Sequence, residues 1–266
     1  MSSVPADSRH RTGETSDDRL PPPSPRRNRS SALERANHSV PAAPAPTELY
    51  AHGLAGRPLY LRAEDGALRT LPVDLWMGPP RAADERTLTR ACGPVLDVGC
   101  GPGRHVLALA QHGVFALGVD IAPAAVQRAR GRGATAVLGS IFDPIPSPRR
   151  WRSALLLDGN IGIGGRPVAL LRRLADLLSP NGRTLCELGR PSSGTSGELV
   201  ALEDASGTRS SWFGWAHVSV DDIASTAARA GMDSAEIWTD DERWFALLIA
   251  RPRPSGMAFG WESRRR

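Results

Sequence analysis

Hydrophobic and polar positions in residues 93–250 alternate between short apolar runs and longer amphipathic stretches. Short apolar runs bounded by glycine, proline or polar residues predict strands, and apolar positions spaced three and four apart predict helices. The predicted strands are 95–98, 116–119, 134–138, 154–157, 183–188, 234–239 and 244–250, and the predicted helices are 105–111, 124–130, 168–178 and 220–230.

This regular alternation predicts an α/β fold. Uniformly apolar strands that alternate with helices are typical of a mostly parallel sheet, buried on both faces by helices. The last two predicted strands follow each other closely, so we expect them to form an antiparallel hairpin. The sequence shows no internal repeat.

The segments outside this region divide into three further parts. Residues 1–46 are rich in proline with few large apolar residues, and we expect a disordered leader there. In residues 47–92, an Asp-Gly pair between short apolar segments predicts a hairpin over 59–73, and 81–91 predicts a short helix. Residues 251–266 form a basic tail.

All 33 basic residues are arginine, and this changes which chemistry is available. Without lysine, the phosphate-binding loop of P-loop enzymes, the protein-kinase site and the Schiff base of pyridoxal-phosphate enzymes are excluded.

The net charge of +5 does not lie on the predicted domain. The leader carries +2 and the tail +4, so residues 47–250 carry −1. An enzyme that acts on nucleic acid needs a positive surface beside its site. The charge pattern therefore disfavours a nucleic-acid partner.

Cysteine usage and hydropathy predict a cytoplasmic protein. Cys92, Cys100 and Cys186 are too few and too widely spaced for a zinc site, and they are typical of free thiols in a reducing compartment. No apolar run approaches a membrane span, and the amino terminus has no secretory pattern. We expect no metal and no membrane association.

The most informative motif follows the first predicted strand of the sheet. It reads Asp97-x-Gly99-x-Gly101-x-Gly103 and opens a helix. Such a turn brings a ligand against the backbone and offers it the N–H groups of a helix N-terminus. A dinucleotide fingerprint requires a third glycine where Arg104 or Val106 stands, so the sequence disfavours a nicotinamide oxidoreductase.

Over residues 93–250 the chain resembles the class I S-adenosylmethionine-dependent methyltransferases. Their first motif matches the glycine turn, and Asp120 ends the second strand where that family keeps an acid for the ribose. The Pro/Gly turn at 179–182 and the terminal hairpin also resemble the family. The resemblance implies a Rossmann-like, seven-stranded sheet and S-adenosylmethionine as cofactor.

The resemblance also implies the cofactor contacts. Asp97 and the glycine turn would hold the methionine half, Asp120 the ribose, and Ile121 the adenine ring. Ser140 stands where an acid for the adenine amine is common, so either Ser140 or Asp143 serves there. The full expected set is Asp97, Gly99, Cys100, Gly101, Gly103, Asp120, Ile121, Ser140, Ile141 and Asp158.

Two segments are candidates for the methyl acceptor. Asp158 and Asn160 follow the fourth strand of the sheet, at the ligand-binding edge of an open α/β sheet. The segment 211–217 gathers Trp212, Trp215 and His217, and similar insertions form the acceptor lid in the family. We expect Asp158, Asn160 and His217 to be catalytic, with His217 a candidate base.

These observations predict an enzyme that transfers a methyl group from S-adenosylmethionine to a small molecule by in-line displacement. An RNA or protein methyltransferase, and a non-catalytic nucleotide-binding protein of the same fold, are the alternatives. The fourth-strand motif lacks the Asn/Asp-Pro-Pro-Tyr/Phe signature of methyltransferases that act on amino groups of nucleic acids or glutamine. No residue identifies the acceptor or the oligomeric state.

Overall fold

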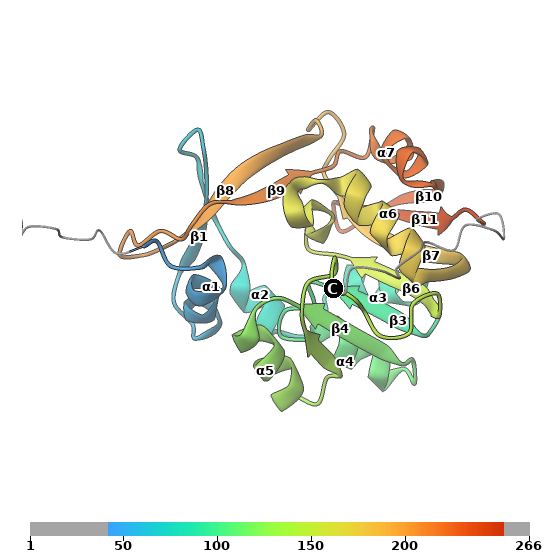
Figure 1. The fold of residues 1–266 in the computed structure, drawn as a ribbon, viewed down its shortest axis with the longest axis horizontal. Coiled ribbons are helices and arrows are strands. Elements are labelled where there is room, and N and C mark those ends of the chain that lie inside the picture. The colour runs from blue at the N-terminus through green and yellow to red at the C-terminus, as the bar shows by residue number, and fades with distance from the viewer. Residues whose placement is uncertain (1–41, 253–266) are drawn as a thin grey trace, which may run out of the picture. The chain divides into compact units, whose positions relative to one another are not determined.

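The computed structural model describes residues 42–252, which contain the predicted seven-stranded sheet (Figure 1). Its order is β10-β11-β7-β6-β3-β4-β5. Strands β5, β4, β3, β6 and β7 are parallel, whereas β11 is antiparallel to both β7 and β10. The predicted fold class is confirmed. The strands are β3 Val95–Val98, β4 Ala116–Asp120, β5 Ala136–Leu138, β6 Trp151–Leu156, β7 Leu178–Leu188, β10 Met232–Asp240 and β11 Arg243–Ala250.

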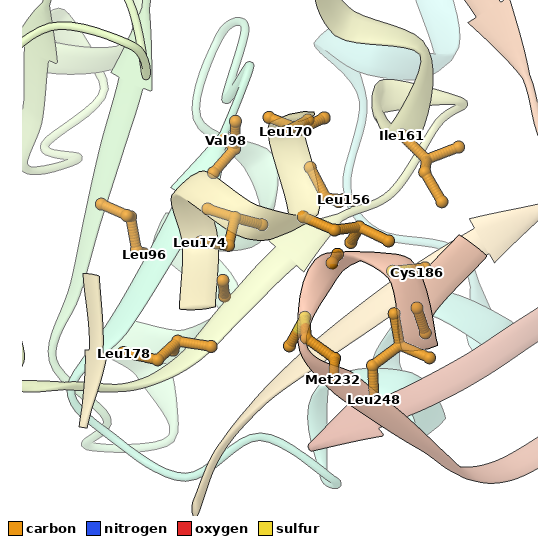
Figure 2. Close-up of a cluster of buried hydrophobic side chains, with 14 of the residues drawn as sticks. Leu96, Val98, Leu156, Ile161, Leu170, Leu174, Leu178, Cys186, Met232 and Leu248 are labelled. Atoms are coloured by element: carbon orange, nitrogen blue, oxygen red, sulfur yellow. The ribbon is translucent and has the colours of Figure 1, made fainter. Parts of the chain in front are cut away.

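Helices cover both faces of this sheet because alternate strand residues point to opposite sides. Leu96, Leu156 and Cys186 pack with α6 and α7, as Figure 2 shows. Their neighbours Val95 and Leu155 pack with α3, α4 and α5 on the other face. The helices are α3 Ala82–Leu88, α4 Arg104–Gln111, α5 Pro123–Gly131, α6 Pro167–Leu177 and α7 Ile223–Ala230.

A second, four-stranded sheet joins the amino-terminal extension to a later segment of the chain. Its order is β2-β1-β8-β9, with every pair antiparallel. The hairpin predicted at 59–73 supplies β1 and β2. The elements here are α1 Pro46–Leu54, β1 Leu59–Ala63, β2 Leu68–Thr70, α2 Val73–Met77, β8 Ser196–Asp204 and β9 Phe213–His217.

This second sheet packs beside the ligand-binding edge of the first. Leu49 of α1, Leu59 of β1 and Leu202 of β8 share a buried cluster with Ala122 and Ala125, which lie at the start of α5. In Figure 1, α1 lies between the second sheet and α5. The amino-terminal extension therefore reaches the end of β4, where Asp120 stands.

Some element predictions were wrong. The Gly/Ser-rich sequence after β7 concealed β8 and β9, and α1 and the 3₁₀ segment η2 (Asn160–Gly165) were not predicted. The helix predicted at 168–178 ends at Leu177, and the predicted turn at 179–182 lies within β7, with Asn181 at φ 60°. The leader and the basic tail lie outside the described residues, except 42–46 and 251–252.

Within residues 42–252, no helix is long and apolar enough to cross a membrane. The same region holds no group of three or more His, Cys, Asp or Glu side chains placed to bind a metal ion.

Candidate functional site

The turn between β3 and α4 adopts a backbone that requires glycine. Gly99, Gly101 and Gly103 have φ of 69°, 52° and 82°, in the left-handed region that other residues rarely adopt. A Cβ on Gly103 would also lie 2.9 Å from the Cβ of Ala134. No side chain caps the start of α4, so its first N–H groups remain available to a ligand.

Asp120 ends β4 directly beside this turn. Its Oδ2 accepts the N–H of Gly101 and its Oδ1 accepts the N–H of Ala122, both at 2.8 Å. Burial raises the pKa of Asp120, while those backbone N–H groups favour its ionised form. Each oxygen of an ionised carboxylate has a further lone pair. Ile121, the next residue, is 61% exposed and offers an apolar surface.

Asp97 is a buried acid whose Oδ2 has no hydrogen-bond partner among the described residues. Nδ1 of His105 lies 3.9 Å from that oxygen, and the two groups would form an ion pair if the imidazole were protonated. Burial, assisted by the negative charges of Asp158 and Asp120, raises the pKa of Asp97 to about 7. Burial and the charge of Arg104 lower the pKa of His105 to about 3. His105 is therefore neutral near pH 7 and does not neutralise Asp97.

Asp158 and Asn160 lie at the end of β6, and both are tied to α4 or the glycine turn. Nη2 of Arg104 donates to both carboxylate oxygens of Asp158, at 2.7 and 2.8 Å. Nδ2 of Asn160 donates to the carbonyls of Val98 and Gly99, at 2.9 and 3.0 Å. The structure thus brings these two predicted residues to the glycine turn. It also shows that Asp158 is paired with a buried guanidinium.

The segment after β5 forms a small turn. The N–H of Ser140 donates to Oδ2 of Asp143 at 3.3 Å, and the N–H of Phe142 donates to Oγ of Ser140 at 3.2 Å. Asp143 therefore reaches back to Ser140, and both polar groups lie together. Ile141 is buried in the apolar core, and Phe142 is 45% exposed.

The three candidate acceptor contacts of segment 211–217 lie in different surroundings. Trp215 lies against η2, since a Cβ on Gly162 would be 2.7 Å from its Nε1. Trp212 is 43% exposed. Nε2 of His217 lies 3.1 Å from Nη1 of Arg69 and 3.3 Å from Oε1 of Glu198, in an exposed cluster on the second sheet.

A hollow of about 720 Å³ lies between η2, the segment after β5 and the second sheet. Glu198, which contacts His217, is part of its lining. The other residues that line it include Glu64, Phe142, Gly164, Arg166 and Leu199.

Tyr50 is a site residue that the sequence did not reveal. It comes from α1, and its hydroxyl would lie 3.2 Å from a Cβ on Gly101. Burial, with the negative charges of Asp120 and Asp158 nearby, raises the pKa of Tyr50, so its hydroxyl stays protonated. Cys100, the predicted contact within the turn, is buried, and burial raises the pKa of its thiol. Only the fold brings α1 to the turn, about fifty residues away in sequence.

A protein-family model matches part of this chain. Residues 95–182 match the model of a family described as a methyltransferase domain. The comparison with curated proteins gave no match.

Solved structures share this fold at low sequence identity. A SAM-dependent methyltransferase from Bacteroides fragilis, in complex with S-adenosyl-L-homocysteine, is 23% identical, with coverage of 79% of this chain and 98% of that one and a TM-score of 0.67. The CcbJ methyltransferase from Streptomyces caelestis is 17% identical, with coverage of 66% and 92% and a TM-score of 0.51. A SAM-dependent methyltransferase from Methanosarcina mazei is 13% identical, with coverage of 60% and 92% and a TM-score of 0.50. These similarities establish the fold.

Proposed function

We propose, from the match of residues 95–182 to a methyltransferase domain, that the protein transfers a methyl group from S-adenosylmethionine to a small molecule. One observation carries the proposal. Asp97, the three left-handed glycines and Asp120 lie together at the carboxyl edge of β3 and β4. This edge is where open α/β sheets bind ligands.

The residues present fit S-adenosylmethionine. Asp97 offers a buried acceptor without a hydrogen-bond partner among the described residues, which suits the ammonium group of the methionine half. Asp120 retains lone pairs for two ribose hydroxyls, in charge-assisted hydrogen bonds. The exposed side chain of Ile121 suits the adenine face, and Ser140 with Asp143 suits its amine.

When bound, the sulfonium supplies an already activated methyl group. The chain then has to hold the reactants in line and exclude water. Asn160 holds the loop after β6 against the glycine turn by its side-chain hydrogen bonds. Asp158 fixes the side chain of Arg104, the first residue of α4, by an ion pair. The hydroxyl of Tyr50 lies beside Gly101, where a Cβ would come within 3.2 Å of it.

We place the acceptor on the side of the second sheet. A hollow of about 720 Å³ is within the usual size of small-molecule sites. The −1 charge of residues 47–250 favours a small molecule over RNA. Trp215 and His217 border this side, and His217 would accept a proton only from an acceptor that must lose one. The same proposal places the protein in the cytoplasm, where the free thiols of Cys92, Cys100 and Cys186 would stay reduced.

The proposal is tested by incubating the protein with methyl-labelled S-adenosylmethionine and panels of small molecules, RNA and proteins. We expect release of S-adenosylhomocysteine with a small-molecule acceptor, and loss of this release in Asp120→Ala. The matched control is Asp233→Asn, which removes a carboxylate that pairs only with the exposed Arg251 among the described residues. Turnover only with RNA or protein would overturn the acceptor class. Cofactor binding without turnover on any panel would favour a non-catalytic role.

A further inference from the structure

The backbone of Asp158 lies in a conformation that few non-glycine residues adopt. Its φ is 56°, in the left-handed region, and Gly159 follows at φ 79°. A non-glycine residue stays in this region only when its surroundings fix it. The turn at 158–159 opens the η2 segment, which carries Asn160 to the glycine turn. The groups that hold Asp158 therefore influence where the loop after β6 meets the glycine turn of the proposed cofactor site.

Two groups form hydrogen bonds with Asp158, and Nη2 of Arg243 lies 3.9 Å from its Oδ1. Arg104 donates to both of its carboxylate oxygens, and Oε2 of Glu187 accepts its backbone N–H at 2.7 Å. Arg104 is only 3% exposed, so this ion pair is largely shielded from water. Side chain and backbone of Asp158 are thus fixed from two different elements, α4 and β7.

Both of these groups are joined through one further acid, Asp84 of α3. Oδ2 of Asp84 accepts Nη1 of Arg104 at 2.8 Å. Oδ1 of Asp84 accepts Nη1 of Arg243 at 2.6 Å. Arg243 in turn donates to both oxygens of Glu187, at 2.8 and 2.7 Å. Asp84 therefore bridges the two arginines, one of which holds Asp158 and the other Glu187.

The burial of Asp84 makes this bridge costly to break. Its side chain is fully buried, and hydrogen bonds and charges from Arg243, Arg81 and Arg104 outweigh burial and lower its pKa to about 2. Removing one member of a buried charge network leaves its partners without compensation. The sequence places Asp84 outside the region that resembles the methyltransferases, among the residues of the amino-terminal extension.

We propose that Asp84 is a positioning residue that fixes the Asp158 turn through Arg104 and Arg243. The inference about the backbone stands on its own contacts, and its consequence for cofactor binding rests on the proposed function. In this proposal, Arg104, which stands where a dinucleotide fingerprint requires glycine, links Asp84 to Asp158.

The experiment is hydrogen–deuterium exchange of the unliganded protein, in wild type and in Asp84→Asn. We expect the amides of 157–166 to exchange about tenfold faster or more in the variant, because two charged hydrogen bonds are weakened, while peptides of α7 keep their rate. The matched control is Glu85→Gln. Glu85 also lies on α3, but it contacts His112 at the surface, outside the network, so this variant should exchange like wild type.

Two results would overturn the inference: unchanged exchange at 157–166, or equal acceleration throughout the core. Should Asp84→Asn not fold, Asp84→Glu carries the same test, because it keeps the buried charge but displaces the carboxylate oxygens that accept Arg104 and Arg243.

A double-mutant cycle separates positioning from general stability. In S-adenosylhomocysteine titrations, Asp84→Asn and Asp158→Asn should lose no more affinity together than the more affected single variant does. Additive losses would contradict coupling between the two sites. If wild type does not bind S-adenosylhomocysteine, the proposed function fails, whereas the exchange result still decides the role of Asp84.

Discussion

The unpaired carboxylate oxygen of Asp97 predicts that cofactor affinity depends on pH. Its pKa near 7 means that about half of the unliganded molecules carry a proton there at pH 7. A cationic ligand binds the ionised form, so it must displace this proton. With a pKa of about 7, the ionised fraction rises about thirtyfold between about pH 5.5 and 8.5. We expect the affinity for S-adenosylmethionine to rise by a similar factor and to level off above about pH 8.

Two titratable neighbours of Asp97 do not change their charge over this pH range. His105 is already neutral because its pKa is about 3, and the raised pKa of Tyr50 keeps its hydroxyl protonated. Asp120 is the other acid at the site with a raised pKa. The variants Asp97→Asn and Asp120→Asn therefore separate the two acids.

The assay is calorimetric titration over this pH range, in buffers of different ionisation enthalpy. Near pH 7, wild type should release about half a proton on binding. Asp97→Asn should bind more weakly and lose the dependence. Asp120→Asn should keep the dependence with its midpoint shifted below 7, because the charge of Asp120 helps to raise the pKa of Asp97. A flat profile in wild type, or an unchanged profile in Asp97→Asn, would show that the protonation of Asp97 does not control cofactor affinity.

Other consequences of the structure are open to measurement. Without ligand, the native protein holds a proton on Asp97 between about pH 4 and 7, whereas the unfolded chain does not. The contribution of Asp97 to the free energy of unfolding therefore falls as pH rises through that range. Urea titrations of Asp97→Asn should lack this slope. Leu174→Ala removes a fully buried side chain and should cost about 2–5 kcal/mol in the same titrations, a prediction that a loss below about 1 kcal/mol would contradict. Gly103→Ala should lower the melting temperature, because its φ is 82° and the new Cβ meets Ala134; an unchanged melting temperature would show that the turn relaxes freely. Asn160→Ala should weaken S-adenosylhomocysteine binding more than it lowers the melting temperature, since it frees the glycine turn without opening a large cavity; equal affinity would exclude that role.

Sequence pattern was sufficient for the large sheet because its strands are short, apolar and separated by helices. In the structure, Leu96 and Leu156 pack on one face of the sheet and their neighbours Val95 and Leu155 on the other. The glycine turn was predictable for a similar reason, since three alternating glycines indicate a left-handed backbone. The position of Asp120 at the end of β4 was predictable, and the residue that ends a parallel strand lies at the ligand edge.

Contacts between distant segments were not predictable. Tyr50 reaches Gly101 only because α1 packs on α5, and no local pattern encodes that packing. The pairing of Arg104 with Asp84 and Asp158 joins three elements across more than seventy residues. The second sheet escaped prediction because β8 follows a Gly/Ser-rich stretch and pairs with β1, far earlier in the chain.

Binding of S-adenosylmethionine at the glycine turn is tested most directly by calorimetric titration of the purified protein with S-adenosylmethionine, S-adenosylhomocysteine and NADH. We expect binding of both adenosyl ligands at micromolar concentrations, loss of that binding in Asp120→Ala, and no binding of NADH. A folded protein that binds neither adenosyl ligand would contradict the assignment of the site.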